Sequence, residues 1–424
     1  MNQKMGKWLR IRYQRVVNSI AFIPALSVLA FLGLALLMLF FDYSPSGKAF
    51  KSRISWLSLK DASTARYITA TVAGGLVSLL VFSFSQVMIL LNQGAGKMSN
   101  RILTGLIVNR FQQVVLGFYV GTIVYALFLL STIRDIHQGV YVPALSIYLL
   151  MLFTIVDIFL FIYFLHFVTQ SVRYEVIIDR LRLETIDALR KRYPLERPEA
   201  PHQLDDFVII HSNTSGYLQG GGKDELLSWC ERTDSVVEAL PLRGSYVIKG
   251  TPVLKLQCPR PLTEAEVDEL LYFLDFYKGQ SVPRNPAYGF HQLKEIAITA
   301  LKPGDPGTAA LCIHALADLF AFHLCHFPQV NFRDEKNRVR ISIQEPDFAQ
   351  LLRDCLLPIL DYARADRIVL DALAEMLSQL RQLARHDAEK APIEDLLERV
   401  RNKREQLHRV AFKGAFSGTL PATL

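Results

Sequence analysis

Residues 142–168 read VPALSIYLLMLFTIVDIFLFIYFLHFV, and Asp157 is the only acid or base in this run apart from a histidine. Three similar runs of at least 20 residues precede it, at Ile20–Phe41, Ile68–Leu91 and Val114–Ile133. A helix of ~20 residues, rising 1.5 Å per residue, crosses the ~30 Å hydrocarbon core of a bilayer. No comparable run is evident after residue 170. We therefore expect a membrane domain of four transmembrane helices over residues 20–172, followed by a large soluble tail.

The basic residues indicate the orientation of these helices. Residues 1–19, the loop between the second and third runs and the stretch after the fourth together carry 14 Lys and Arg, whereas the two remaining loops carry 6. Short loops rich in Lys and Arg stay on the cytoplasmic side, so we expect both termini in the cytoplasm. Trp8 and Tyr13 among five basic residues make residues 1–19 a candidate interfacial segment.

Cysteine and charge agree with a cytoplasmic tail. All five cysteines lie after residue 229, an odd number without the regular spacing of a disulfide scaffold. The net charge of +7 comes substantially from clusters next to the membrane, which suit anionic lipid head groups. The bilayer is therefore the expected partner of these basic residues, and nucleic acid is not.

The tail divides by composition and periodicity. Residues 173–201 continue the helical pattern and end in three prolines, which predicts a stalk helix and a linker. Residues 202–261 hold short strands between Gly, Pro and Asn, which predicts a small β-barrel or sandwich module. Gly216-Tyr217, Arg243–Val247 and Gly250–Leu254 are spaced in a way that is similar to the barrel-sandwich hybrids of biotinyl and lipoyl domains, and this likeness implies a fold only.

Residues 262–411 are expected to form a helical cytoplasmic domain, and residues 412–424 a disordered tail. Thr263 and Glu266 form a capping box ahead of the first of these helices. A strand pair is predicted at Val330–Phe332 and Val339–Ile343. Further helices are predicted at 291–301, 307–323, 345–355, 357–385 and 393–408.

Three collinear motifs resemble one known family. They are Asn109–Thr122 with Tyr125, Phe161–His166, and Gly289 through Ala309. They resemble the bacterial membrane proteins grouped as domain of unknown function 2254, and the likeness covers nearly the whole chain. It implies a multi-pass protein of the bacterial inner membrane.

Asp157 is the sharpest candidate for function. A carboxylate at mid-span costs ~2.5–3.5 kcal/mol on insertion scales, so it should face the bundle interior or a wet cavity. Gln86, Ser83 and Ser85 on the second helix are its expected partners. It either lies on an ion or proton path or is a neutral hydrogen-bonding group between helices.

Other polar residues lie at the proposed cytoplasmic mouth of the third helix. Asn109, Arg110, Gln112 and Gln113 form either a gating ring in an oligomer or an ordinary interfacial helix start. Small residues on the second and third helices indicate close helix packing, within or between subunits, and we expect a homo-oligomer. These small residues are Gly117, Gly121, Gly74 and Gly75.

Two features of the tail are candidates for ligand binding. Asp305 and Thr308 open a helix whose N-terminus either is capped by Asp305 or, with Arg284, binds an anion. Cys312, His314, His323, Cys325 and His326 lack metal-ligand spacing, so no metal is expected. No phosphate-binding loop, dinucleotide fingerprint or nucleophile elbow is present, so we expect neither a cofactor nor an enzyme.

Two functions fit this pattern. The first is an oligomeric channel-like or transport assembly, passing ions and gated by its cytoplasmic domain. The second is a membrane-anchored scaffold or sensor whose tail binds a soluble partner.

Overall fold

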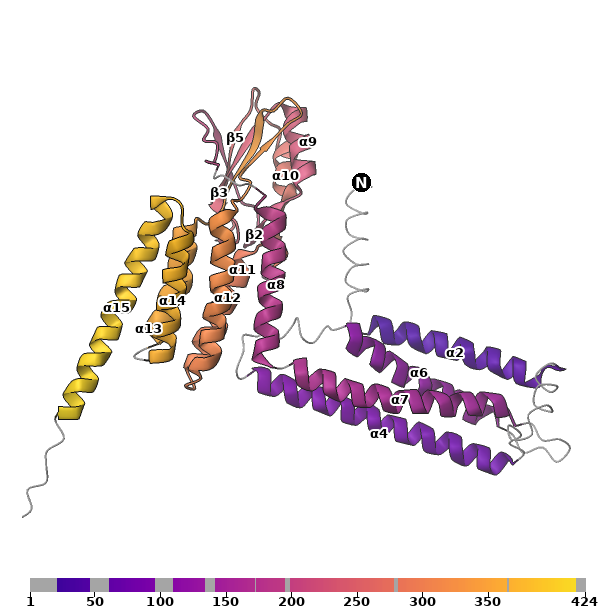
Figure 1. Cartoon of the computed structure of the whole chain (residues 1–424). Helices are drawn as coiled ribbons and strands as arrows, with labels where there is room; N and C mark the ends of the chain where they lie inside the picture. Colours follow the sequence, from indigo (N-terminus) through magenta and orange to yellow (C-terminus); the bar gives the residue numbers. More distant parts are fainter. Residues whose placement is uncertain are drawn as a thin grey trace, which may run out of the picture. The chain divides into compact units, whose positions relative to one another are not determined.

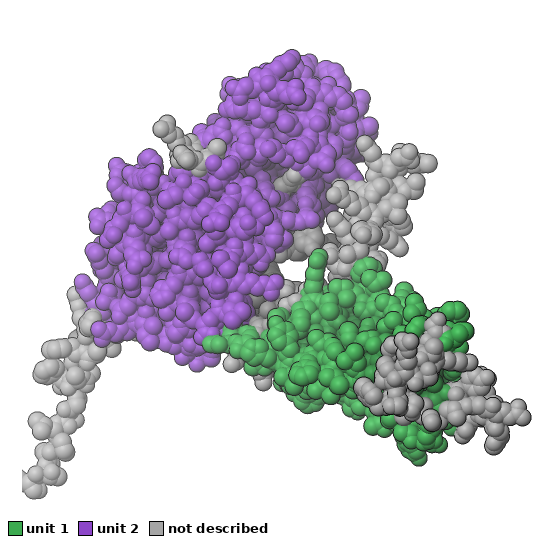
Figure 2. Space-filling view, turned by 45° about the vertical axis from the view of Figure 1, so that its right-hand side comes forward, with its two compact units in different colours: residues 1–96, 100–173 green, residues 97–99, 174–424 purple. Residues whose placement is uncertain are grey.

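The computed structural model describes residues 21–45, 61–95, 110–133, 142–171, 173–194, 199–277, 281–363 and 366–416. The chain forms two compact units, an N-terminal unit of residues 1–96 and 100–173 and a C-terminal unit of residues 97–99 and 174–424 (Figure 2). The predicted interfacial segment 1–19 lies outside the described residues.

The described residues of the N-terminal unit form four long helices (Figure 1): α2 (Phe22–Tyr43), α4 (Ala62–Ala95), α6 (Arg110–Thr132) and α7 (Ala144–Ser171). Helix α6 packs against the other three, and half of its most apolar segment is buried, against 11% for α2. Large apolar side chains such as Phe40 and Phe159 remain exposed, as on helices that face lipid. The expectation of a helical protein with several candidate membrane spans is confirmed.

A fifth helix corrects the expectation that no apolar run follows residue 170. Helix α12 (Pro306–Cys325) is also long and apolar enough to cross a membrane. More than half of its most apolar segment is buried, because it packs against α8 (Tyr174–Arg192), α11 (Ala287–Leu301) and α14 (Arg367–Leu383). Length and composition alone cannot separate such a buried core helix from a transmembrane one.

Helix α8 lies where the sequence predicts a stalk, but it is an integral part of the C-terminal unit. Helix α7 ends at Ser171 and α8 begins at Tyr174. Ile177, Leu181 and Leu189 bury one face of α8 within its unit. A Cβ atom on Gly289 of α11 would lie 1.9 Å from Thr185 Oγ1, so the glycine permits α8 and α11 to approach closely.

The strands form two sheets, and neither is a closed barrel in the described residues. The larger sheet has the order β1-β5-β3-β8-β7, and the smaller has the order β4-β2-β6. Strand β3 pairs parallel with β8, with Val237 opposite Ile341. The expected β-barrel does not close, and strands beyond residue 261 join both sheets. The strands are β1 (Val208–His211), β2 (Gly216–Gly221), β3 (Val236–Leu242), β4 (Tyr246–Val247), β5 (Pro252–Gln257), β6 (Leu274–Tyr277), β7 (Asn331–Arg333) and β8 (Val339–Gln344).

The remaining helices complete the C-terminal unit. Thr263 and Glu266 form the predicted capping box at the start of α10. Helix α9 packs near β8, and α13 to α15 join the bundle of α11 and α12. Helix α15 continues to Phe416, past the residue where the tail was expected to lose its structure. The helices are α9 (Lys223–Thr233), α10 (Glu264–Phe273), α13 (Phe348–Tyr362), α14 and α15 (Asp387–Phe416).

Candidate functional site

Asp157 is completely buried within the N-terminal unit. Neither of its carboxylate oxygens has a hydrogen-bond partner among the described residues. Thr122 and Tyr119 of α6 lie near it, but the Thr122 hydroxyl donates to the Phe118 carbonyl, and the buried Tyr119 hydroxyl is also without a partner. A buried polar group left without a hydrogen bond costs ~1–3 kcal/mol.

The expected partners of Asp157 on the second helix do not bond to it. The hydroxyls of Ser83 and Ser85 donate to the carbonyls of Leu79 and Val81 in their own helix. Gln86 is only partly buried and has no contact with Asp157 among the interactions of the described residues. The structure therefore places Asp157 beside α6 rather than beside the polar residues of α4.

The polar residues at the start of the third helix differ in exposure. Gln113 is buried, Gln112 is partly buried and Arg110 is exposed, while Asn109 lies outside the described residues. Because these three side chains differ in exposure, one chain alone does not form the predicted gating ring. Such a ring would require several chains.

The glycines of α6 are closely packed, whereas those of α4 are not. A Cβ atom on Gly117 would lie 2.6 Å from Ser27 Oγ, and one on Gly121 would lie 2.6 Å from the Phe31 ring. Both glycines therefore let α2 pack closely on α6. A Cβ atom on Gly74 or Gly75 would meet nothing within 4 Å, so these glycines do not pack within the described chain.

Asp42 is a buried carboxylate of the N-terminal unit that the sequence analysis did not single out. It accepts hydrogen bonds from the backbone N–H of Ser146, at 2.9 Å, and from the Ser146 hydroxyl, at 2.6 Å. It thereby caps the start of α7, where unpaired N–H groups favour a negative charge. Tyr125 donates to the Ser146 carbonyl at 3.1 Å. Asp42 therefore has a structural role as a helix cap. The described contacts show no such role for Asp157.

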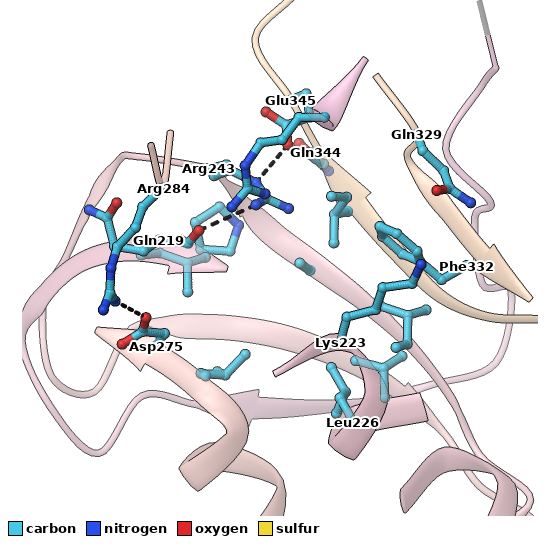
Figure 3. A pocket seen from close by; sticks show the side chains of 18 of the residues that line it. Gln219, Lys223, Leu226, Arg243, Asp275, Arg284, Gln329, Phe332, Gln344 and Glu345 are labelled. Carbon is cyan, nitrogen blue, oxygen red and sulfur yellow. Dashed lines mark hydrogen bonds and ion pairs between the residues drawn. The ribbon is translucent and has the colours of Figure 1, made fainter. Parts of the chain in front are cut away.

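A cavity of about 520 Å³ lies between the two sheets of the C-terminal unit (Figure 3). Its floor is apolar and includes Leu226, Val237 and Ile341. Two acidic side chains, Asp275 and Glu345, line it together with five basic ones. The basic residues are Lys191, Arg192, Lys223, Arg243 and Arg284.

Not all of these cations are neutralised. Arg243 Nε lies 2.6 Å from Glu345 Oε1 in a buried ion pair, and Arg284 pairs with Asp275. Lys223 Nζ lies 4.8 Å from the centre of the Phe332 ring, across the cavity from Arg243 in Figure 3. The guanidinium of Arg192 has no hydrogen bond or ion pair within the part of the chain that the structure describes.

Burial shifts the ionisation of the arginine and the glutamate at this end of the cavity. Burial and then the nearby charge of Arg243 lower the pKa of Arg192 to about 10, so it stays charged at neutral pH. Burial raises the pKa of Glu345, although Arg243 and Arg192 oppose that rise. The cavity therefore favours an anion, and an apolar group attached to that anion would contact the floor.

The predicted anion loop is divided between two places. Arg284 lines the cavity, whereas Asp305 caps α12 by accepting from the Thr308 backbone N–H at 3.1 Å and from the Thr308 hydroxyl at 2.7 Å. Asp305 and Thr308 do not line the cavity, so the structure does not bring the three residues together.

A sequence profile of the family described as "Predicted membrane protein (DUF2254)" matches residues 17–379. The chain belongs to this family. The match confirms the resemblance seen in the sequence motifs. It also covers both Asp157 and the whole lining of the cationic cavity, which are therefore parts of the DUF2254 region of the chain.

Three curated proteins are similar to this DUF2254 chain. They are "Uncharacterized protein MT1328" and "Uncharacterized protein Rv1290c" from two strains of Mycobacterium tuberculosis, and "Uncharacterized protein Mb1321c" from Mycobacterium bovis. Each is 25% identical over 336 residues, which cover 75% of this chain and 64% of the relative. The chain thus spans less than two thirds of the relatives' length. No solved structure matches it.

The cavity residues of this DUF2254 protein were mostly missed by the sequence analysis. Arg284 was singled out, but Arg192, Arg243 and Glu345 were not. They come from a helix end, a turn and a strand end that are far apart in the chain. No spacing rule connects such positions. The pairing of β3 with β8 brings Arg243 and Glu345 together, and Arg192 comes from the end of α8.

Proposed function

We propose that the protein is a membrane-anchored sensor whose C-terminal unit binds an anionic small molecule in the cationic cavity. The observation that carries this is a 520 Å³ cavity with more basic than acidic side chains, in which Arg192 has no ion pair with any described residue. The volume lies within the usual ~300–1,000 Å³ of small-molecule sites. The apolar floor suits a ligand with a hydrophobic body, and the protein is a receptor rather than an enzyme.

The test is a binding measurement on the full chain in lipid nanodiscs. Phenyl phosphate supplies an anion on an aromatic body, and phenol is its matched neutral control. Phenyl phosphate should bind more tightly than phenol, and Arg192→Gln should weaken it about tenfold, as expected for one charge-assisted hydrogen bond. Arg232→Gln is the control, because Arg232 is exposed and pairs with Glu269 away from the cavity. Equal affinities for the two probes would contradict the proposal.

The proposed topology has four spans in a bacterial inner membrane, with both termini and the C-terminal unit in the cytoplasm. In this proposal α12 is a core helix of that unit and not a span. Cys325 is exposed, whereas Cys230 and Cys355 are buried, so Cys325 is the informative site for labelling. An impermeant maleimide should label Cys325 only after the membrane of intact cells is opened. Labelling of Cys325 from outside would overturn this topology.

A second function is favoured by Asp157. In this alternative, several chains form a channel-like or transport assembly gated by the C-terminal unit, and Asp157 lies on its ion or proton path. Asp157 is a fully buried carboxylate in a membrane helix, without a hydrogen-bond partner among the described residues, and this supports the alternative because such residues commonly mark ion or proton pathways. In liposomes, Asp157→Asn should change flux or its dependence on pH while the assembly stays intact. If the wild-type protein shows no flux, this alternative is rejected and the sensor function remains.

A further inference from the structure

The C-terminal unit contains a second cavity, of about 550 Å³. It is lined by residues from the end of α12, the turn between β8 and α13, and the start of α15. Gln344 and Glu345 line both cavities. The two cavities are therefore neighbours, but their walls have opposite charge.

The second cavity is acidic. Among the described residues, four carboxylates line it and no Lys or Arg does. Glu345 and Glu199 are paired with Arg243 and Arg333. The other two carboxylates, Asp347 and Glu389, are not in ion pairs among the described residues.

Asp347 and Glu389 are fixed by the helix starts that they cap. Asp347 accepts from the Gln350 backbone N–H through one oxygen, and Glu389 accepts from the Arg385 and His386 backbone N–H groups through one oxygen. Each carboxylate keeps its second oxygen without a hydrogen bond in the described structure. Two negatively charged acceptors are thus available at the wall of one cavity.

A buried histidine in the same wall is the second, independent sign of a ligand. His323 is 3% exposed, and neither of its ring nitrogens has a hydrogen bond within the part of the chain that the structure describes. Its ring packs edge-on against the ring of Tyr193 and at a tilt against that of Phe348. Burial lowers the pKa of His323 to about 4, so the ring is neutral at physiological pH and one nitrogen is an unused acceptor.

We propose that this cavity binds a small organic amine with an apolar body. The ammonium group donates hydrogen bonds to the second oxygens of Asp347 and Glu389 and to the acceptor nitrogen of His323. The apolar body packs on Phe327 and Phe348, which line the cavity with three prolines. Aromatic faces also attract a cation. The four carboxylates of the described wall disfavour an anion.

The proposal is tested by calorimetric titration of the full-length protein with 2-phenylethylamine, 2-phenylethanol and 3-phenylpropanoate. These probes share an aromatic body and differ in charge. The amine should bind at least tenfold more tightly than the alcohol, and the carboxylate should not bind. Asp347→Asn and Glu389→Gln keep an oxygen for capping and remove the charge, and each should weaken amine binding about tenfold.

Two further variants keep the test decisive. Asp366→Asn is the matched control, because Asp366 caps α14 through the Val369 N–H and does not line the cavity, so amine binding should be unchanged. His323→Phe retains the ring contacts and removes both nitrogens, and it should also weaken the amine. Equal affinity for amine and alcohol, no detectable amine binding, or amine binding unaffected by the Asp347 and Glu389 variants would each overturn the proposal. Phenyl phosphate binding in the same samples reports on the first cavity separately.

Discussion

Glu345 in the C-terminal unit and Asp157 in the N-terminal unit are both buried carboxylates, but their surroundings differ. Glu345 lies 2.6 Å from Arg243 Nε in an ion pair whose side chains are 6% and 10% exposed. Asp157 is 0% exposed, and neither of its oxygens is hydrogen-bonded to a described residue. Sheets and turns bring distant cations to Glu345, whereas the helices around Asp157 offer only hydroxyl groups nearby. The comparison indicates that Glu345 can be buried because Arg243 pairs with it. The burial of Asp157 instead lowers the stability of the folded protein.

Removing the partner of Glu345 should have the largest effect. Arg243→Met leaves a buried carboxylate without its ion pair, which should lower the free energy of unfolding by ~3–5 kcal/mol. Chemical denaturation of the full chain in detergent measures this. The double variant Arg243→Met with Glu345→Leu should recover most of the loss, because an apolar pair of similar size can replace a buried ion pair. A single variant as stable as the wild type would show that Glu345 does not depend on Arg243.

The stability of the N-terminal unit should instead depend on the size of the side chains between its helices. Gly121→Leu forces side-chain atoms into the Phe31 ring and should destabilise the bundle by ~1–3 kcal/mol, a typical cost of overpacking. Gly74→Leu is the matched control in α4, where the added atoms meet open space. Thermal unfolding of both variants compares them. Destabilisation by Gly74→Leu would instead place Gly74 against another chain in an oligomer.

His323 is a buried titratable side chain of the C-terminal unit, and among the described residues neither of its ring nitrogens has a hydrogen-bond partner. Its pKa of about 4 is below the ~6.5 of an unfolded chain, so only the unfolded state takes up the proton between these values. The contribution of neutral His323 to the free energy of unfolding is fully present above pH 6.5, and it is lost as the pH falls towards 4. At pH 5 the loss should be about 2 kcal/mol, from the linkage between protonation and unfolding. His323→Phe should remove that part of the pH dependence, and a profile unchanged by the substitution would show that another group causes it.

The smallest effect is expected at Asp157. Asp157→Asn should leave stability nearly unchanged, and Asp157→Leu should raise it by ~1 kcal/mol, because an unpaired buried polar group is removed. Reversible unfolding in detergent with matched single variants measures both. A clear loss of stability in Asp157→Leu would mean that Asp157 is hydrogen-bonded in the assembled protein, and the contrast with Glu345 would then fail.

The membrane helices and the capping box were predictable because each depends on local sequence. An apolar run has to be long enough to span lipid, and a capping box needs only two residues at fixed spacing. The strand pair near residues 330–343 was predictable for the same reason, and β7 and β8 form it. The glycines of α6 could be recognised as packing residues, but their partner helix α2 could not.

The sheet arrangement and the cavities could not be predicted, because they depend on pairing between distant segments. The expected barrel does not close, and β3 instead pairs parallel with β8, a strand that lies far along the chain. The predicted break near residue 356 also failed, since α13 runs from Phe348 to Tyr362 and includes Pro358. Neither the charge of the first cavity nor the acidity of the second is visible until these segments are adjacent.

The pairing of β3 with β8 also determines when the protein can fold during its synthesis. The two strands are on the order of 100 residues apart, and the intervening chain includes α10, α11 and α12. A chain still emerging from the ribosome cannot complete the larger sheet until β8 is free to pair. Because Ile341 and Glu345 line the cationic cavity, that cavity forms only after nearly all of the sheet-bearing sequence has been translated. A chain shortened before β8 would leave one side of β3 as an unpaired strand edge, which favours aggregation.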